Sequence, residues 1–304
     1  MAERFWGIDL GGTKIEAVVI GDCMQPLARR RIDTMAERGY DHILLRVREL
    51  LSLVSEETGL AVPGLIGLGT PGRYDERSGS MKNSNTVSLN GRDLKHDLED
   101  VLGLNVMIEN DANCFALAES LMGAGEQLMR DPSKTAFGII IGTGVGAGIV
   151  SHREVRRGAH GIAGEWGHNE LIPDGEPCYC GRRGCVETVI SGPALEQYYT
   201  YLGGRRKPLR EIVSATDSDP LAGKTVERLV SYFGKALAAV INILDPDICI
   251  IGGGVGQTEQ LYSTETVRAV EQYLFNSELR IPLLRPLLGD SAGVFGAALL
   301  PKIH

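Results

Sequence analysis

Residues 5–20 read FWGIDLGGTKIEAVVI. Two apolar, β-prone arms flank a glycine-rich turn, and this pattern predicts a β-hairpin. Residues 137–150 read FGIIIGTGVGAGIV and repeat the same design much later in the chain. Because solenoid repeats recur at far shorter periods, two widely separated copies of one strand–turn–strand unit indicate two related lobes.

Helices and strands alternate along the rest of the chain. Apolar residues recur at helical spacing over 41–58, where Gly59 follows as a stop, and over 226–244, where Asp245 and Pro246 end the helix. Further segments read as strands (65–69, 104–109 and 248–251) or as helices (94–102, 111–122 and 293–300). This alternation favours an α/β fold.

The composition of the 304 residues excludes several classes of protein. Hydrophobic residues make up 43% of the chain, which is an ordinary globular value, and the net charge is −8. Basic residues form no long run, so we expect no nucleic-acid partner and no anionic membrane partner. The sequence shows no apolar stretch of the ~20 residues that a membrane helix needs and no signal peptide. We therefore expect a cytoplasmic protein.

Three glycine-rich turns have the composition of phosphate-binding loops. They are Gly11-Gly12-Thr13, Gly142-Thr143-Gly144 and Gly252-Gly253-Gly254. Such turns expose backbone N–H groups to a phosphate, and Asp9 beside the first turn is placed to hold Mg²⁺. None of them is a Walker loop or a dinucleotide-binding fingerprint. The alternative interpretation is that the glycines only permit tight hairpins.

The segment Asp9-Leu10-Gly11-Gly12-Thr13-Lys14 resembles the opening signature of the ROK family of bacterial sugar kinases and repressors. The resemblance extends over essentially the whole chain. It implies the actin-like ATPase fold, a duplicated ribonuclease H-like architecture with two lobes around a central cleft. On this basis we expect a small lobe of residues 1–115 plus 291–304 and a large lobe of residues 116–290. The small lobe would hold the first turn, the sugar loops and the catalytic aspartate.

The resemblance also assigns the nucleotide-binding and catalytic residues. It implies that Gly11 to Lys14 and Gly142 to Gly144 embrace the ATP phosphates, and that Gly252 to Gly254 lies against adenosine. Asn110-Asp111-Ala112-Asn113 is similar to the family's catalytic segment, in which this aspartate is the general base and the asparagine binds sugar. The residues alone leave a second interpretation for Asp111, which is that it only caps the following helix.

Sugar recognition needs several converging hydrogen-bonding groups. Glu165-Trp166-Gly167-His168 matches the family's sugar-contacting motif, and the resemblance implies that the turn from 69 to 72 lines the same cleft. All of these side chains also fit an ordinary role as loop polar residues. The predicted sugar-binding residues are Gly72, Asn85, Asn90, Gly91, Asn110, Asp111, Glu165, His168 and Glu187.

Three of the six cysteines crowd into eight residues behind a histidine. His168, Cys178, Cys180 and Cys185 follow the spacing His-x9-Cys-x-Cys-x4-Cys, which suits a closed tetrahedral zinc site. Three thiolates with no open position favour a structural metal over a catalytic one. The pattern also resembles the family's zinc motif. The alternative is three free thiols packed in a core.

The sequence therefore predicts an ATP- and Mg²⁺-dependent hexose kinase with a structural Zn²⁺. Residues 82–85, 89–91, 162–169 and 177–180 look most like the fructokinase/mannokinase branch, so fructose, and also mannose, are the expected substrates for 6-phosphorylation. Ser88 departs from that branch, which often has an aromatic residue there. The alternatives are an N-acetylglucosamine kinase or a glucokinase, then a sugar-responsive repressor or a plain ATPase. The family is commonly dimeric, so we expect a homodimer.

Overall fold

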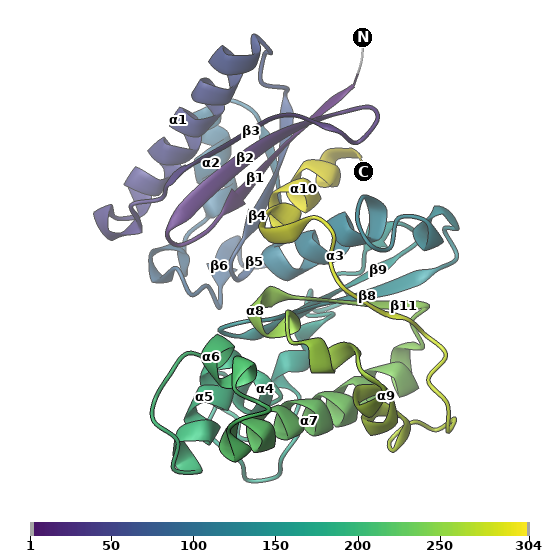
Figure 1. Ribbon diagram of the computed structural model, residues 1–304. Helices are drawn as coiled ribbons and strands as arrows, with labels where there is room; N and C mark the ends of the chain where they lie inside the picture. The colour runs from purple at the N-terminus through teal and green to yellow at the C-terminus, as the bar shows by residue number, and fades with distance from the viewer. Residues whose placement is uncertain (1–2, 303–304) are drawn as a thin grey trace. The chain divides into compact units, whose positions relative to one another are not determined.

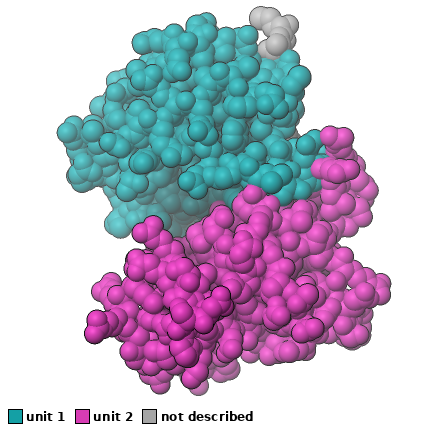
Figure 2. Space-filling model, in the orientation of Figure 1, with its two compact units in different colours: residues 1–126, 153–155, 287–304 teal, residues 127–152, 156–286 magenta. Residues whose placement is uncertain are grey.

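The computed structural model describes residues 3–302, and these form two compact units (Figure 2). Unit 1 comprises residues 1–126, 153–155 and 287–304, and unit 2 comprises residues 127–152 and 156–286. The changeovers after 126 and 286 differ from the expected 115 and 290, because the whole of helix α3 (Asp111–Leu121) belongs to unit 1. Among the described residues, no helix has both the length and the hydropathy that crossing a bilayer needs.

Unit 1 is built on a five-stranded mixed sheet in the order β3-β2-β1-β4-β7 (Figure 1). The first three strands are antiparallel, whereas β4 and β7 continue the sheet in parallel with β1. The strands are β1 (Arg4–Leu10), β2 (Lys14–Gly21), β3 (Pro26–Asp33), β4 (Leu65–Thr70) and β7 (Asn105–Asn110). A separate hairpin pairs β5 (Arg73–Asp75) with β6 (Ser80–Lys82).

Alternation along β1 places different chemistry on the two faces of the first sheet. Trp6, Ile8 and Leu10 pack into a core with α1 (Tyr40–Thr58) and α2 (Leu94–Leu102). Both helices end, as predicted, at a glycine with positive φ, Gly59 and Gly103.

The other face of this sheet is covered by α10 (Ala292–Leu299). Gly7 of β1 pairs with Gly67 of β4, and a Cβ on either residue would lie within 2.2 Å of the α10 backbone. Gly296 brings α10 equally close to α3, since a Cβ there would lie 1.9 Å from the Cys114 carbonyl oxygen. These glycines let α10 approach the strand that carries Asp9.

Unit 2 repeats the topology of unit 1. Within the unit, its sheet has the order β9-β8-β11-β12, with β8 and β9 antiparallel and β8, β11 and β12 parallel, which matches the β2-β1-β4-β7 part of the first sheet. The strands of unit 2 are β8 (Thr135–Ile141), β9 (Val145–Ser151), β11 (Ile248–Gly252) and β12 (Leu283–Leu284). The two-residue strand β10 (Glu154–Val155) belongs to unit 1. The two matching sheets confirm the duplicated α/β fold with two lobes.

The long helix α7 (Pro220–Leu244) covers the second sheet and carries the predicted apolar stripe. The other helices of unit 2 are α4 (Glu187–Ile190), α5 (Gly192–Tyr201), α6 (Leu209–Ser214), α8 (Gly253–Gly256) and α9 (Thr264–Glu271).

Short 3-10 helices occur in both units. They lie at Ala36–Arg38, Val87–Leu89, Leu128–Arg130, Glu165–His168, Glu259–Tyr262, Gly289–Ser291 and Leu300–Lys302.

Candidate functional site

The first glycine-rich turn, residues 11–13, connects β1 to β2 as predicted. The Gly11 N–H closes the turn on the Lys14 carbonyl oxygen at 3.0 Å, so this N–H does not face outward. Thr34 braces the turn: its hydroxyl donates to the Gly11 carbonyl oxygen at 2.7 Å and its N–H donates to the Thr13 carbonyl oxygen at 2.8 Å. The exposed Gly12 and Thr13 are therefore the residues whose N–H groups the phosphate prediction needs.

Asp9 is half-buried at the end of β1, two residues before this turn. Burial, followed by the charges of Asp111 and Glu16, raises the pKa of Asp9 to about 7, although Arg31 acts to lower it. The carboxylate lies beside the first turn of α10, because a Cβ on Gly293 would be 3.1 Å from it. Carboxylates that gather in this way suit a divalent cation, whose charge would favour their ionised forms.

Glu16 stands opposite Asp9 on β2 and is buried. Two arginines of β3 neutralise it: Arg29 Nε lies 3.2 Å from one carboxylate oxygen and Arg31 Nε lies 3.1 Å from the other. Ser291, next to α10, donates a further hydrogen bond to it at 3.2 Å. Glu16 therefore has its own cations, whereas Asp9 is left with one distant arginine and is the better candidate for a metal.

The turn from β7 to α3 carries the predicted catalytic segment. Asn110 is the N-cap of α3, since its side-chain oxygen accepts from the Ala112 N–H at 2.9 Å, and its amide nitrogen donates to the Gly72 carbonyl oxygen at 3.0 Å. Asp111 is the first helical residue and is exposed, with one carboxylate oxygen 2.8 Å from the same Ala112 N–H. The neighbouring asparagine thus supplies the cap, and the Asp111 carboxylate stands at the positive end of the helix.

The Glu109 side chain holds this turn through two hydrogen bonds. It is buried, and its Oε1 accepts from the Asn110 N–H and from the Asn113 amide nitrogen, both at 2.9 Å. This brace fixes the start of α3 and hence the direction of Asp111. Glu109 has no predicted role, although a carboxylate four residues before an asparagine at the start of a helix is a pattern that could have indicated this brace.

The loop that follows β6 holds three predicted sugar ligands, Asn85, Asn90 and Gly91, and a fourth, Gly72, packs against it from the residue before β5. The Asn90 side chain makes two hydrogen bonds to the Ser84 backbone. Its oxygen accepts from the Ser84 N–H and its nitrogen donates to the Ser84 carbonyl oxygen, both at 2.9 Å, so Asn90 braces the loop. Gly72 has a φ of +84°, and a Cβ there would lie 2.7 Å from the Ser84 backbone. Asn85 is exposed, and Gly91 has a φ of +78°. Direct sugar contact by these four residues stays a prediction.

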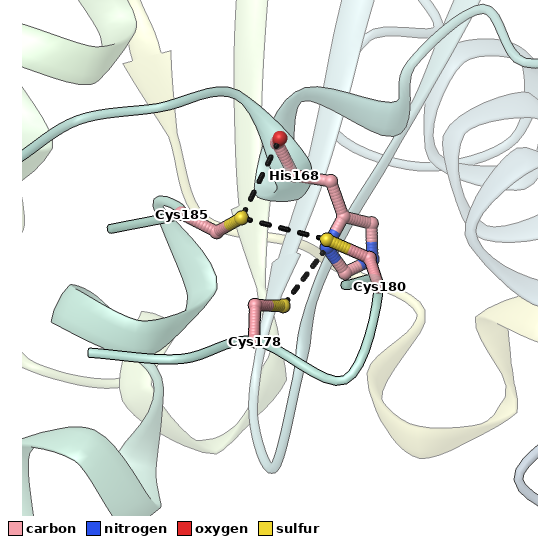
Figure 3. Close-up of side chains that lie close together, drawn as sticks. All are labelled: His168, Cys178, Cys180 and Cys185. Carbon is pink, nitrogen blue, oxygen red and sulfur yellow. Dashed lines mark hydrogen bonds between the residues drawn. The ribbon is translucent and has the colours of Figure 1, made fainter. Parts of the chain in front are cut away.

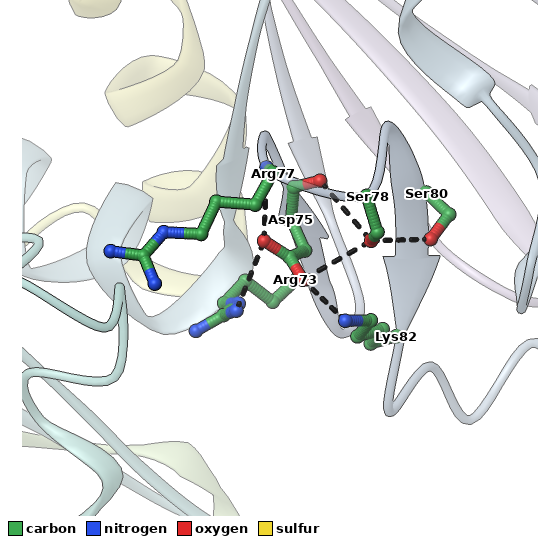
Figure 4. A network of polar contacts seen from close by, with 6 residues as sticks. All are labelled: Arg73, Asp75, Arg77, Ser78, Ser80 and Lys82. Carbon is green, nitrogen blue, oxygen red and sulfur yellow. Dashed lines mark hydrogen bonds and ion pairs between the residues drawn. The ribbon is translucent and has the colours of Figure 1, made fainter.

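The β5–β6 hairpin leads into this loop and is fixed by charge (Figure 4). Asp75 accepts hydrogen bonds from the Lys82 ammonium, the Arg77 N–H and the Ser78 hydroxyl, and Arg73 lies 3.7 Å away. The Lys82 hydrogen bond is the main cause that lowers the pKa of Asp75 to about 2. The ammonium group of Lys82, the last residue of β6 before the loop, is therefore paired with Asp75.

The second glycine-rich turn, residues 142–144, connects β8 to β9 in unit 2. The Gly142 N–H closes the turn on the Gly144 carbonyl oxygen at 2.9 Å, and the Gly192 N–H at the start of α5 donates to the Gly142 carbonyl oxygen at 2.8 Å. Glu187, a predicted sugar ligand, accepts from the Val145 N–H at 2.9 Å. A Cβ on Gly144 would lie 2.6 Å from the same Glu187 oxygen, so only glycine leaves room for this brace.

The third glycine-rich segment lies directly against the second. Gly252 ends β11, and Gly253 has a φ of +81°. A Cβ on Gly253 would lie 2.3 Å from the carbonyl oxygen of Ile141, the residue that precedes the second turn. Gly254 faces open space, because nothing lies within 4 Å of its ideal Cβ. The structure thus brings the two nucleotide-binding segments predicted in unit 2 together.

The Glu165–His168 segment forms a short 3-10 helix on the same sheet. Gly164 and Gly167 pack against the backbone of β9, where added Cβ atoms would lie 2.3 Å from the Ala147 oxygen and 2.0 Å from the Val145 oxygen. Trp166 is buried and anchors the segment through edge contacts with two phenylalanines of the core. Glu165 is exposed. The segment is therefore attached to the strand that leaves the second turn.

His168, Cys178, Cys180 and Cys185 converge in unit 2, with their ligand atoms all within 4.8 Å of one another (Figure 3). The Cys178 sulfur lies 3.5 Å from His168 Nδ1, and the Cys180 and Cys185 sulfurs lie 3.6 Å apart. The edge of a tetrahedron around Zn²⁺ with Zn–S bonds of 2.3 Å is about 3.8 Å, so the donor set fits this metal. His168 Nε2 bonds to the Tyr179 hydroxyl at 2.9 Å, which fixes the ring with Nδ1 toward the thiols.

The thiols of this cluster differ in acidity. Burial acts to raise the pKa of Cys180, but hydrogen bonds from Arg182 and from the neighbouring thiols outweigh it and lower the pKa to about 6. Burial is the main cause that raises the pKa of Cys178 and that of Cys185, the latter to about 12. One thiolate at neutral pH gives a cation its first anionic ligand.

Each unit therefore gathers one part of the predicted site. Unit 1 holds the first turn, the acidic residues and the loop with the asparagines, and unit 2 holds the other two turns, the 3-10 helix and the cysteine cluster. Each unit thus contributes one glycine-rich hairpin turn, and Asp9, Glu16 and Asp111 lie in unit 1.

The chain belongs to the ROK family, whose sequence pattern it matches over residues 5–303. The N-acetyl-D-glucosamine kinase of Aliivibrio salmonicida (strain LFI1238) is 35% identical over 309 residues, which cover 97% of this chain and 99% of that protein. The crystal structure of the ROK hexokinase from Thermus thermophilus has a TM-score of 0.86 and 35% identity, covering 98% of this chain and 97% of that one. A ROK family glucokinase from Streptomyces griseus, in complex with glucose and AMPPNP, has a TM-score of 0.79 and 29% identity over 99% of this chain and 100% of that one.

Proposed function

We propose that the protein is an ATP-dependent sugar kinase that phosphorylates N-acetyl-D-glucosamine. The observation that carries the substrate assignment is the 35% identity, over nearly the whole of both chains, to an N-acetyl-D-glucosamine kinase. The sugar kinase class has wider support, since a ROK hexokinase and a ROK glucokinase share the fold at 35% and 29% identity. The expected fructokinase/mannokinase branch is thus less well supported than the alternative considered with it.

In the proposed reaction, Asp111 is the general base. A sugar hydroxyl attacks the γ-phosphorus of ATP, a new P–O bond forms, the bond to the β–γ bridging oxygen breaks, and ADP leaves. The hydroxyl proton passes to the Asp111 carboxylate, which stands exposed at the start of α3. Asn110 and Glu109 hold that start in place.

The remaining predicted residues have binding roles in this proposal. Gly12, Thr13 and Lys14 in unit 1 and residues 142–144 in unit 2 bind the phosphates through N–H groups and the lysine charge. Asp9 would hold the Mg²⁺ that accompanies ATP, a cation that neutralises charge on the transferred phosphoryl group. Gly254, which faces open space, is the part of the third segment best suited to lie against adenosine. Asn85, Asn90, Glu165 and Glu187 remain the proposed sugar-binding side chains. Both ring nitrogens of His168 already have partners, so its part in sugar binding would be to hold the segment that carries Glu165.

We further propose that His168 and the three cysteines hold a structural Zn²⁺. The fit of the donor set to a tetrahedron supports this assignment, as does the low pKa of Cys180. A metal there would fix the loop between the 3-10 helix and α4, and so the two glutamates at its ends, Glu165 and Glu187. We also retain a homodimer in the cytoplasm as the expected state, and light scattering on the purified protein would test the homodimer.

A sugar panel tests the substrate assignment. ADP release with Mg-ATP is measured against N-acetylglucosamine, N-acetylmannosamine, glucose, fructose and mannose at equal concentrations. We expect the highest kcat/KM with N-acetylglucosamine. Preference for fructose or mannose would restore the other branch and keep the kinase chemistry, whereas no stimulation by any sugar would refute the proposed function.

A further inference from the structure

Thr86 has a buried hydroxyl that the loop itself does not use. The residue lies between the predicted sugar ligands Asn85 and Asn90 and is 7% exposed. Its N–H donates to the Ser84 hydroxyl at 3.1 Å, and its carbonyl oxygen accepts from the Leu89 N–H at 2.9 Å. The Thr86 hydroxyl oxygen, by contrast, has no hydrogen-bond partner among residues 3–302.

This hydroxyl faces the first phosphate turn. A Cβ added to Gly12 would lie 3.1 Å from the Thr86 hydroxyl oxygen, so the absence of a side chain at Gly12 is what lets the hydroxyl approach the turn. Thr34 contacts the same turn, and its hydroxyl donates a hydrogen bond to the Gly11 carbonyl oxygen at 2.7 Å. Two threonines therefore pack on one turn, one with a partner and one without.

A buried hydroxyl without a partner is unfavourable, and a valine of nearly the same shape would avoid that cost. Such a group is explained when it gains a partner in another state of the protein. A threonine hydroxyl rotates freely and both donates and accepts, so it can follow a shift of the adjacent peptide, which valine does not allow. In the proposed kinase, phosphate binding to the Gly12 and Thr13 N–H groups is the event that would shift peptides in this turn.

We propose that Thr86 is a positioning residue for phosphoryl transfer: its hydroxyl gains a hydrogen bond to the Gly12–Thr13 turn when nucleotide phosphates bind there. The bond links the phosphate turn to the loop that carries Asn85 and Asn90, both within unit 1. The proposal rests on the proposed kinase function and adds a direct connection between its nucleotide side and its sugar side.

Thr86→Val, Thr86→Ser and the control Thr34→Val in the full chain test the proposal. Without ligand, Thr86→Val should melt about 2–4 °C above the wild type, because it removes the unpartnered hydroxyl. Thr34→Val should melt lower, because it breaks a bond that exists. With Mg-ATP and sugar, Thr86→Val should lose about five- to tenfold in kcat/KM for ATP, while Thr86→Ser keeps wild-type turnover.

A second readout does not depend on turnover. A non-hydrolysable ATP analogue with Mg²⁺ should raise the melting temperature of the wild type and Thr86→Ser more than that of Thr86→Val. Equal shifts, or a Thr86→Val protein that melts lower without ligand, would overturn the proposal. If the wild type phosphorylates no sugar, the kinase assignment fails, but the analogue shifts still decide the role of Thr86.

Discussion

The two hairpins at the centre of the two units have the same topology and different chemistry. In unit 1, the strand residues paired one step before the turn are Asp9 and Glu16; in unit 2, the residues paired at the same step are Ile140 and Gly146. The first turn is braced by the neutral Thr34 hydroxyl and the second by the Glu187 carboxylate. Duplication thus provides two similar backbones, and substitutions at this strand pair place two carboxylates next to the turn in unit 1 but none at the same positions in unit 2.

This difference predicts a division of labour. The acidic residues of unit 1 would carry the cation and the proton, while unit 2 would contribute N–H groups and a rigid frame.

Replacing the proposed base should have the largest effect. Asp111→Asn removes the carboxylate but keeps the shape of the side chain, so kcat should fall by about 10²- to 10⁴-fold. Sugar binding, measured by calorimetry, should change little. The exposed Asp100→Asn on α2 is the matched control and should keep wild-type kcat. Near-normal turnover of Asp111→Asn would show that another group accepts the proton.

Removal of the proposed metal should weaken unit 2 selectively. Chelation of Zn²⁺ is expected to lower the melting temperature by several degrees and to raise KM for ATP and sugar, because Glu187, which braces the second turn, follows the ligand Cys185 by two residues. Metal content is measured by mass spectrometry before and after chelation. An unchanged melting temperature after verified metal loss would contradict the structural role.

The raised pKa of Asp9 predicts a pH-dependent stability. Because its pKa in the folded protein is about 7, against 3.8 as the reference value, folding favours the protonated form, and this stabilisation is lost as pH rises from about 4 through 7. In Mg²⁺-free buffer, unfolding free energy should therefore fall between pH 5 and pH 8 by at most about 3 kcal/mol more in the wild type than in Asp9→Asn. Parallel curves for the two proteins would mean that Asp9 ionises normally.

Alanine substitutions at two adjacent glycines of the third glycine-rich segment should differ in their effect on the free energy of unfolding. Gly253→Ala should destabilise the protein by about 2 kcal/mol or more, because Gly253 combines a φ of +81° with a contact to the Ile141 backbone. Gly254→Ala adds its methyl group to open space and should stay within about 0.5 kcal/mol of the wild type. Urea unfolding measures both, and equal losses would argue against the described packing of Gly253 on Ile141.

Local patterns predicted much of this structure. The glycine-rich hairpins, the helix ends at Gly59 and Gly103, and the apolar stripe of α7 all follow from spacing and turn chemistry within short windows of sequence. The cluster of His168 and three cysteines could also be predicted from the sequence, because its four residues lie within a segment of eighteen residues.

Contacts between distant segments could not be predicted in this way. Thr34 reaches the first turn from the end of β3, Glu187 reaches the second turn across 42 residues, and Thr86 reaches Gly12 from another loop. An isolated threonine or glutamate in a loop has no local signature of such a contact. The same reason explains why Asn90, predicted as a sugar ligand, has its amide on Ser84.

Phosphorus NMR of the reaction product shows whether the protein transfers phosphate to N-acetylglucosamine and whether the transfer needs Asp111. The wild type and Asp111→Asn are incubated with Mg-ATP and N-acetylglucosamine, and the spectra are followed for a sugar phosphate monoester resonance. The account predicts that this resonance grows with ADP in the wild type and is nearly absent with Asp111→Asn. ADP and inorganic phosphate without a sugar phosphate, or equal product from both proteins, would contradict it.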